Sequence, residues 1–177
     1  MNNKKHFVFI GAILAIVLVV GGLIYQQEDI LRNGDSVILA TRPVDPRDLF
    51  RGEYVILRYE IESDEKIEQL IKDQKINNGE KIYIKLSDDL NPISYVVEAR
   101  KEKPESFEDL WIVGEVNGVG VRFPSLEQFY VPEGAGPSVE MMGSDLHVKV
   151  ILKNSESRIS QLLDGNLDDI DVNLFLE

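Results

Sequence analysis

The sequence predicts a mainly β protein in which an N-terminal transmembrane helix is followed by a small β-barrel or sandwich-like domain with one or two short helices. Three observations support this fold class. An uncharged apolar run opens the chain, seven or eight short segments then alternate apolar and polar residues, and turn residues separate those segments. Short strands at such regular spacing are typical of antiparallel barrels and sandwiches.

The apolar run covers residues 7–25 and contains no charged residue. As a helix it would be about 28 Å long, close to the hydrocarbon thickness of a bilayer. Lys4 and Lys5 precede it, so the positive-inside rule places residues 1–6 in the cytoplasm and the C-terminal domain outside. A cleaved signal peptide is the alternative. The run is longer than the usual apolar region of a signal peptide, which favours an uncleaved, single-pass anchor in the cell membrane.

The charge of the remaining chain excludes one class of partner. Residues 26–177 carry 17 basic residues against 31 acidic ones, a net charge of −14. Such a domain is repelled by nucleic acid and by anionic lipid, so we expect no nucleic-acid role.

There is no cysteine, which excludes disulfides, cysteine-ligated zinc, iron–sulfur clusters and thiol catalysis. We expect no cofactor and identify no small-molecule ligand.

The segments after the membrane run predict a juxtamembrane helix or linker at 26–33 and an outer domain at 34–177. Asn33-Gly34 is expected to end the helix, with the glycine in the left-handed region. A surface helix is expected at 63–73, capped by Ser63. Strands are expected at 35–41, 54–61, 81–86, 93–99, 110–116, 119–123, 146–152 and 170–176, with a tight turn at Asn117-Gly118; residues 158–163 fit either a strand or a helical turn.

The alternation also predicts which side chains face the core. In the segment 54–61 these are Val55, Leu57, Tyr59 and Ile61, and in the segment 93–99 they are Ile93, Tyr95, Val97 and Ala99.

Two patterns suggest a metal, and neither is strong. His6 and His147 are isolated, and His147 is expected on the outward row of its strand. The segment from Asp164 to Asp169 resembles the start of a calcium loop. However, Asp169 occupies the position of the required glycine and Phe175 that of the glutamate, which favours a solvated turn. No serine lies in a nucleophile elbow, and no glycine-rich phosphate loop occurs.

The most distinctive polar residues flank a loop rich in glycine and proline. Glu133 and Glu140 could form a general acid/base pair or an ion site. They could also pair with arginines, which we favour because buried acids are normally paired. The candidate polar network consists of Arg47, Arg51, Glu53, Arg122, Glu133 and Glu140.

Residues 52–59, Gly-Glu-Tyr-Val-Ile-Leu-Arg-Tyr, resemble the motif that names the GDYXXLXY protein family, with Glu53 in place of aspartate. The flank 43–51 and the later stretch from Arg122 to Glu140 also resemble this family, and together they cover about residues 34–165. The residues expected to determine the fold within these motifs are Gly52, Tyr54, Leu57, Tyr59, Pro132 and Gly134. The resemblance implies a membrane-anchored bacterial protein whose relatives often lie beside, or are fused to, multi-pass membrane proteins. It implies no catalytic residue.

A weaker likeness concerns the membrane-anchored type I signal peptidases. The segments from Gly34 to Val37 and from Arg51 to Val55 are similar to their paired Gly-Asp turns. Their nucleophilic serine should precede Gly34, and residues 25–33 contain no serine. The chain is therefore not expected to be a working peptidase of that kind.

These observations predict a membrane-anchored extracytoplasmic binding or scaffold module, an accessory subunit of a multi-pass membrane protein. Two alternatives remain open. One is an envelope hydrolase that uses Glu133 and Glu140 as its carboxylate pair, and the other is an extracellular cation-binding module.

Overall fold

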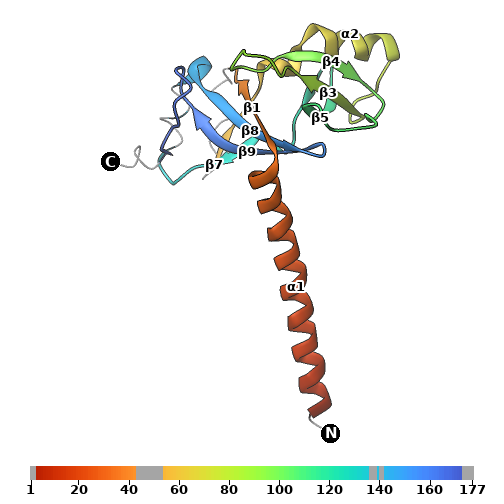
Figure 1. Cartoon of the computed structure of the whole chain (residues 1–177), viewed down its shortest axis with the longest axis vertical. Helices are drawn as coiled ribbons and strands as arrows, with labels where there is room; N and C mark the ends of the chain where they lie inside the picture. Colours follow the sequence, from red (N-terminus) through yellow and green to blue (C-terminus); the bar gives the residue numbers. More distant parts are fainter. Residues whose placement is uncertain (1–2, 43–53, 136–138, 140–141, 173–177) are drawn as a thin grey trace.

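The computed structural model describes residues 3–42, 54–135, 139 and 142–172. Its first element, α1 (Asn3–Asn33), is a single continuous helix that leaves the rest of the molecule as a long stalk (Figure 1). From Phe9 onward this helix is long and apolar enough to cross a membrane. Its large apolar side chains from Phe9 to Tyr25 are between 47% and 75% exposed, so the described part of the outer domain does not cover them.

One half of the outer domain is built from two small antiparallel sheets. The larger has the strand order β1-β8-β9, formed by β1 (Asp35–Ala40), β8 (His147–Lys153) and β9 (Glu156–Leu163). The smaller pairs β2 (Tyr54–Ile56) with β7 (Gln128–Tyr130). The segment 158–163, which fitted two interpretations, is thus part of a strand.

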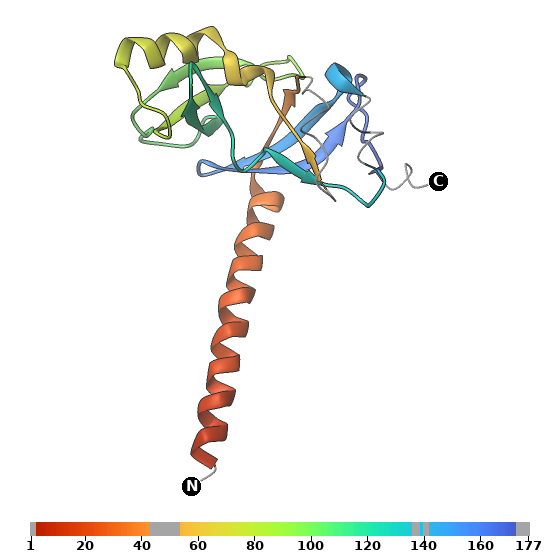
Figure 2. The same cartoon turned by 180° about the vertical axis from the view of Figure 1, so that it is seen from behind.

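The other half is a four-stranded sheet of order β4-β3-β5-β6, formed by β4 (Val96–Arg100), β3 (Lys81–Leu86), β5 (Trp111–Asn117) and β6 (Gly120–Arg122). The helix α2 (Glu65–Gln74) lies over this half, at the end of the domain remote from the stalk (Figures 1 and 2). Two short 3-10 helices, η2 (Glu60–Ser63) and η3 (Gly143–Asp145), complete the described elements. No sheet closes into a barrel within the described residues, so the sandwich-like version of the predicted fold is the one observed.

A single hydrophobic core joins the two halves. It receives Leu39, Val148 and Leu162 from the first sheet and Ile82, Ile84 and Ile112 from the second. Full burial of such a side chain contributes roughly 1.5–3 kcal/mol. The predicted inward residues Val55, Leu57, Tyr59 and Ile61 are all buried, although only the first part of that segment forms a strand.

The predicted inward row of β4 is only partly right, because Ala99 packs against the core but Tyr95 and Val97 do not. Tyr95 and Val97 are exposed, whereas Val96 is buried. The pairing of β3 with β4 shifts register between Lys85 and Leu86, and such a bulge reverses which side chains face the core. The Tyr95 hydroxyl instead donates a hydrogen bond of 2.6 Å to the Asp89 carboxylate.

Two predicted helix ends are also corrected. Asp64, and not Ser63, caps α2, because its carboxylate accepts the Lys66 N–H at 2.9 Å. Gly34 ends α1 as predicted, but its φ is not positive. A Cβ atom there would lie 2.5 Å from the Ile151 side chain and 2.7 Å from the Leu152 carbonyl oxygen. Glycine is therefore required by the close approach of β8 and not by a left-handed cap.

Two further differences concern turns and the last segment. The β5–β6 loop consists of Gly118 and Val119, one residue later than predicted, and Gly118 supplies the positive φ of +67°. Residues 170–172 are not in a strand, and only Asp169 makes an isolated bridge, to Leu163. The remainder of the predicted strand 170–176 lies outside the described residues.

Candidate functional site

The two motif stretches lie side by side in the fold. β2 pairs with β7 so that Tyr54 lies opposite Tyr130 and Val55 opposite Phe129. The rings of Tyr54 and Tyr130 meet edge to face, with centroids 6.1 Å apart. Strands separated by more than 70 positions are thereby joined at the place where the sequence shows its two most distinctive patterns.

The predicted fold residues of the first motif are buried anchors. Leu57 is 2% exposed and Tyr59 is fully buried. The Tyr59 hydroxyl donates a hydrogen bond of 2.8 Å to the Leu126 carbonyl, and its ring meets the edge of Phe123. Burial raises the pKa of this hydroxyl, with a smaller effect from the Glu62 charge. Tyr59 therefore acts as a neutral hydrogen-bond donor that fastens the motif to the chain before β7.

In the second motif, Pro132 and Gly134 form a turn. The Pro132 carbonyl accepts the Ala135 N–H at 3.0 Å, and Gly134 has a φ of +94° that favours glycine. Glu133 lies on this turn and is exposed. Gly52 of the first motif lies outside the described residues.

The candidate polar network is only partly described. Arg122 pairs with Glu115 across the β5–β6 hairpin, at 3.1 Å. Arg47, Arg51, Glu53 and Glu140 lie outside the described residues. A contact of Arg51 with Glu133 or Glu140, and the spacing of the Glu133–Glu140 pair, therefore stay predictions.

A different cluster of charges lies directly behind the motif. The Glu62 carboxylate accepts a hydrogen bond of 2.9 Å from Arg42 and lies 4.0 Å from the guanidinium of Arg58, which in turn pairs with Glu127 at 2.7 Å. The Glu62 side chain is only 3% exposed. Its second oxygen, Oε1, has no hydrogen-bond partner among the described residues. We call Arg42, Arg58, Glu62 and Glu127 the buried charge cluster.

The backbone explains how the acid reaches this position. Glu62 lies in η2, where the chain leaves the period-two pattern of the motif and turns inward. Gly120 of β6 packs so closely on the Glu62 carbonyl that a Cβ atom would have no room. The sequence pattern does not predict this position, because strict alternation places Glu62 on the outward row with Glu60.

Burial raises the pKa of Glu62, and the nearby charges of Arg58 and Arg42 offset only part of that effect. A carboxyl group with a raised pKa can hold a proton. However, a side chain that is 3% exposed is closed to any substrate in this conformation. The cluster therefore stabilises the arrangement of the motif, and its chemistry is that of a structural ion network.

A second group of polar side chains fastens the stalk to the outer domain. Lys153 donates a hydrogen bond of 2.6 Å to Asp29, Arg158 donates one of 2.6 Å to the side-chain oxygen of Gln27, and the Gln26 amide lies 3.4 Å from Glu156. All three outer partners belong to the β8–β9 hairpin, whose two-residue loop has positive φ at both Asn154 and Ser155. Ile30 of α1 is 4% exposed. We call these contacts the helix–hairpin junction.

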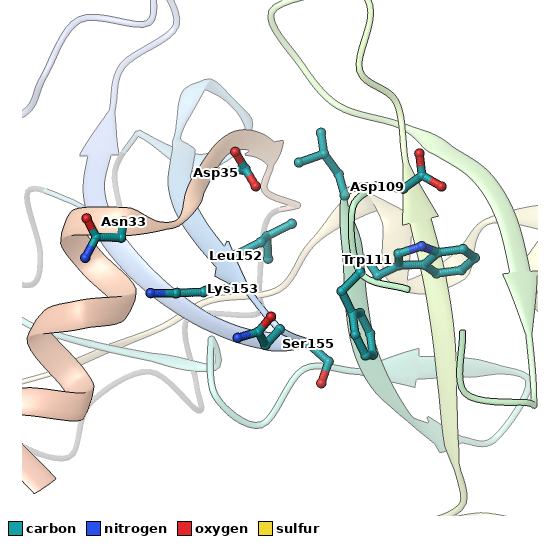
Figure 3. A pocket seen from close by; sticks show the side chains of 10 residues that line it. Asn33, Asp35, Asp109, Trp111, Leu152, Lys153 and Ser155 are labelled. Atoms are coloured by element: carbon teal, nitrogen blue, oxygen red, sulfur yellow. The ribbon is translucent and has the colours of Figure 1, made fainter. Parts of the chain in front are cut away.

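A pocket of about 220 Å³ opens beside this junction. Figure 3 shows Asn33 and Asp35 on one side of it, with Asp109 and Trp111 on the other and the hairpin residues Lys153 and Ser155 below. Asp109 already pairs with Lys85 at 2.8 Å. Arg100 lies over the Trp111 ring at 4.2 Å. The lining of this pocket is thus partly polar and partly apolar, and its charged side chains Asp109 and Lys153 are already in ion pairs.

A larger pocket of about 380 Å³ also borders the β8–β9 hairpin. Its charged lining is Lys81, Glu115, Glu156 and Arg158, and its hydroxyl lining includes Ser125 and Ser157. The two serine oxygens are 2.7 Å apart. This volume lies within the ordinary range of small-molecule sites. Nothing in the sequence pattern pointed to it, because its walls come from both halves of the domain.

The remaining predicted metal positions are placed as follows. His147 is 9% exposed, so its expected outward position is wrong, and within the part of the chain that the structure describes its Nδ1 atom has no hydrogen-bond partner. The Asp164 carboxylate accepts the backbone N–H groups of Asp168 and Asn166, and these bonds, that of Asp168 most strongly, lower its pKa. This carboxylate closes its own turn, as in the solvated alternative to a calcium loop. His6 lies where side chains are not described.

Comparison with known proteins bears on the identity of the chain. No curated protein and no solved structure matches it. The family model described as "GDYXXLXY protein" matches residues 16–160, which include most of the outer domain and the end of the apolar helix. The two motif stretches that pair as β2 and β7 both lie within this match. The chain therefore belongs to the GDYXXLXY protein family.

Proposed function

We propose that this protein is a single-pass, membrane-anchored binding module whose outer domain is extracytoplasmic, and that it serves as an accessory subunit of a multi-pass membrane protein. The observation that carries the proposal is the combination of an uncovered apolar helix with the helix–hairpin junction. The large apolar side chains of α1 from Phe9 to Tyr25 are exposed, while the polar end of the helix is built into the domain.

The junction supports an anchor that also positions the domain. Three side-chain contacts and the buried Ile30 hold the end of α1 against the hairpin. A flexible linker would leave the domain free to rotate. A held helix instead presents one face of the domain, and one face of the helix, to a membrane neighbour.

The membrane part of the proposal is tested by extraction and protease protection. The full chain should resist alkaline extraction, and protease added outside intact cells should remove the outer domain. Release by alkali would contradict the anchor. Protection of the domain in intact cells, with digestion only after lysis, would contradict the orientation.

The partner is tested by photo-crosslinking along α1 in native membranes. A crosslinking residue is placed in turn at each position from Ile13 to Val20. A partner helix packs on one face, so protein adducts should recur with the helical period of about 3.6 residues. Mass spectrometry should identify a multi-pass protein in those adducts. The same residue at Lys72, on the exposed side of α2, is the control. Adducts with lipid alone, or adducts without periodicity, would contradict an accessory role.

A further inference from the structure

The 380 Å³ pocket on the hairpin lies at the level of the membrane surface, if α1 is the anchor proposed above. Its walls include Glu156 and Arg158, which contact Gln26 and Gln27 of α1 directly. These glutamines follow Tyr25, the last residue of the uncharged run. At 1.5 Å per helical residue, they lie within about 3 Å of the end of that run.

The headgroup region of a bilayer is thick enough to include the position of Gln26 and Gln27. The polar zone of a bilayer extends about 5–8 Å beyond the hydrocarbon on each side. Tyr25 is 75% exposed, as expected for an aromatic residue at this boundary. The pocket wall that contacts Gln26 and Gln27 therefore lies among the lipid headgroups. The β8–β9 hairpin that supplies this wall lies at the end of the domain from which α1 leaves (Figure 1).

The lining of the pocket has the groups that a zwitterionic headgroup requires. Lys81 is exposed and, within the described residues, has no ion-pair partner. Arg158 uses Nε for Gln27 and Nη1 for the Ser157 carbonyl, which leaves donors on its guanidinium for a further acceptor. Ser125 and Ser157 add hydroxyl groups. These are donors of the kind that bind a phosphate oxygen.

The carboxylates of the same pocket fit the other end of the headgroup. Glu115 pairs with Arg122 through Oε2, and Glu156 accepts only a weak hydrogen bond of 3.4 Å from Gln26 and a distant contact of 3.5 Å from Arg158. A primary ammonium group offers three N–H donors to such acceptors. The two acids balance the two cations of the lining, whereas residues 26–177 as a whole carry a charge of −14. An anionic headgroup would be repelled by the domain.

We propose that this pocket, formed by the β8–β9 hairpin and strands β3 and β5, binds the phosphoethanolamine headgroup of a lipid in the leaflet from which α1 emerges. Lys81 and Arg158 bind the phosphate, and Glu115 and Glu156 bind the ammonium group. The bound lipid and the helix–hairpin junction together fix the underside of the domain on the membrane. The proposal rests on the anchor and is independent of the identity of the protein partner.

The test uses the full chain in nanodiscs that contain equal amounts of phosphatidylcholine, phosphatidylethanolamine and phosphatidylglycerol. Native mass spectrometry then measures the lipids retained after release from the disc. Wild type should retain phosphatidylethanolamine in preference to the other two. Lys81→Ala should reduce this retention about tenfold, because it removes one charge-assisted hydrogen bond. Lys72→Ala removes another exposed lysine, on α2, and should change nothing. The fluorescence of Trp111, the only tryptophan of the chain, verifies that each variant is folded.

Several results would overturn the proposal. Equal retention by wild type and Lys81→Ala would do so, as would preferential retention of phosphatidylglycerol or the absence of any enriched lipid. If inorganic phosphate alone raises the melting temperature of wild type but not of Lys81→Ala, the pocket binds free phosphate and the lipid assignment is wrong. Failure of the anchor is recognised separately, because the chain would then be released by alkali.

Discussion

Two groups of charged side chains in the outer domain differ most in how far the carboxylate of each is exposed to water. In the buried charge cluster, the Glu62 side chain is 3% exposed and has arginines on two sides. In the helix–hairpin junction, Lys153 and Asp29 are 26% and 35% exposed. Water screens the Lys153–Asp29 pair and also reaches Arg42 and Arg58, which are 45% and 32% exposed, but it scarcely reaches the Glu62 carboxylate. We therefore expect the cluster to control whether the domain folds and the junction to control how the domain is held on its helix.

The largest effect is expected at Tyr59, which joins the motif to the core beside the cluster. Tyr59→Ala removes a fully buried ring and should lower the free energy of unfolding by about 3–5 kcal/mol. Tyr59→Phe keeps the ring and loses only the bond to the Leu126 carbonyl, for a cost of about 1–2 kcal/mol. Denaturant unfolding of the full chain in detergent, followed by Trp111 fluorescence, measures both. Equal losses in the two variants would show that the hydroxyl, and not the packing, dominates.

The next effect concerns Glu62. Glu62→Ala leaves Arg42 and Arg58 without their shared acid and should cost about 2–3 kcal/mol, below the value for a fully buried pair because both arginines are partly exposed. Glu62→Gln keeps the shape and the bond to Arg42, so its cost should be smaller. The same denaturant titration compares the two variants.

The pH dependence gives a sharper test of the same residue. The pKa of Glu62 is raised in the folded state above its ordinary value of 4.5, so the folded state holds its proton more tightly than the unfolded state does. Its contribution to stability is fully present below pH 4.5 and is lost as the pH rises through the folded pKa. The stability of wild type relative to Glu62→Gln should therefore fall as the pH rises from about 4 to 7. An increase over that range would mean that the arginines, and not burial, determine the pKa.

Glu80 should show the opposite dependence, which makes it a useful internal reference. Its hydrogen bonds, that from Lys101 first, lower its pKa to about 2. The stability it contributes is present above pH 4.5 and is lost as the pH falls through about 2.

The difference between the two regions also explains what the sequence could predict. The motif segment alternates so regularly that its inward residues Val55 to Ile61 followed from period two alone. The burial of Glu62 did not follow, because the chain turns into η2 at Glu60 and carries an acid inward against the pattern. The prediction that Tyr95 and Val97 face the core failed for a similar reason. The bulge beside Leu86 depends on the pairing of β4 with β3, and it leaves no trace in the sequence of β4 itself.

Of the helix–hairpin junction, only the helix could be predicted from the sequence. The end of α1 at Asn33 followed from Asn33-Gly34, and the membrane run followed from composition. Its partners in the hairpin are more than 120 positions away, and a lysine–aspartate contact over that separation has no local signature. The 380 Å³ pocket has no local signature either, because its walls come from three strands.

A change at Gly34 tests whether the two regions are independent. Gly34→Ala places a methyl group against Ile151 and the Leu152 carbonyl, so the helix end and β8 must separate slightly, at a cost of about 1–2 kcal/mol. Because the clash lies at the junction, the pH dependence assigned to Glu62 should be unchanged. Gly22→Ala, in the apolar run where a Cβ atom meets nothing within 4 Å, is the matched control and should leave stability unaltered. A change in the pH profile of Gly34→Ala would show that the junction and the cluster are coupled.

The smallest effect on stability, and the clearest effect on orientation, is expected at Lys153. Lys153→Ala removes a partly exposed ion pair, which contributes less than about 1 kcal/mol. The contact nevertheless holds Asp29 and the hairpin 2.6 Å apart, so its loss should let the domain sample more orientations about the end of α1. Spin labels at Lys72 on α2 and at Ala12 on α1 report this as a broader distance distribution in nanodiscs, whereas Lys101→Ala, which removes a comparable exposed pair with Glu80, should leave the distribution unchanged. An unchanged distribution in Lys153→Ala would mean that Ile30 and Gly34 alone hold the domain, and the polar part of the junction would then have no role in positioning it.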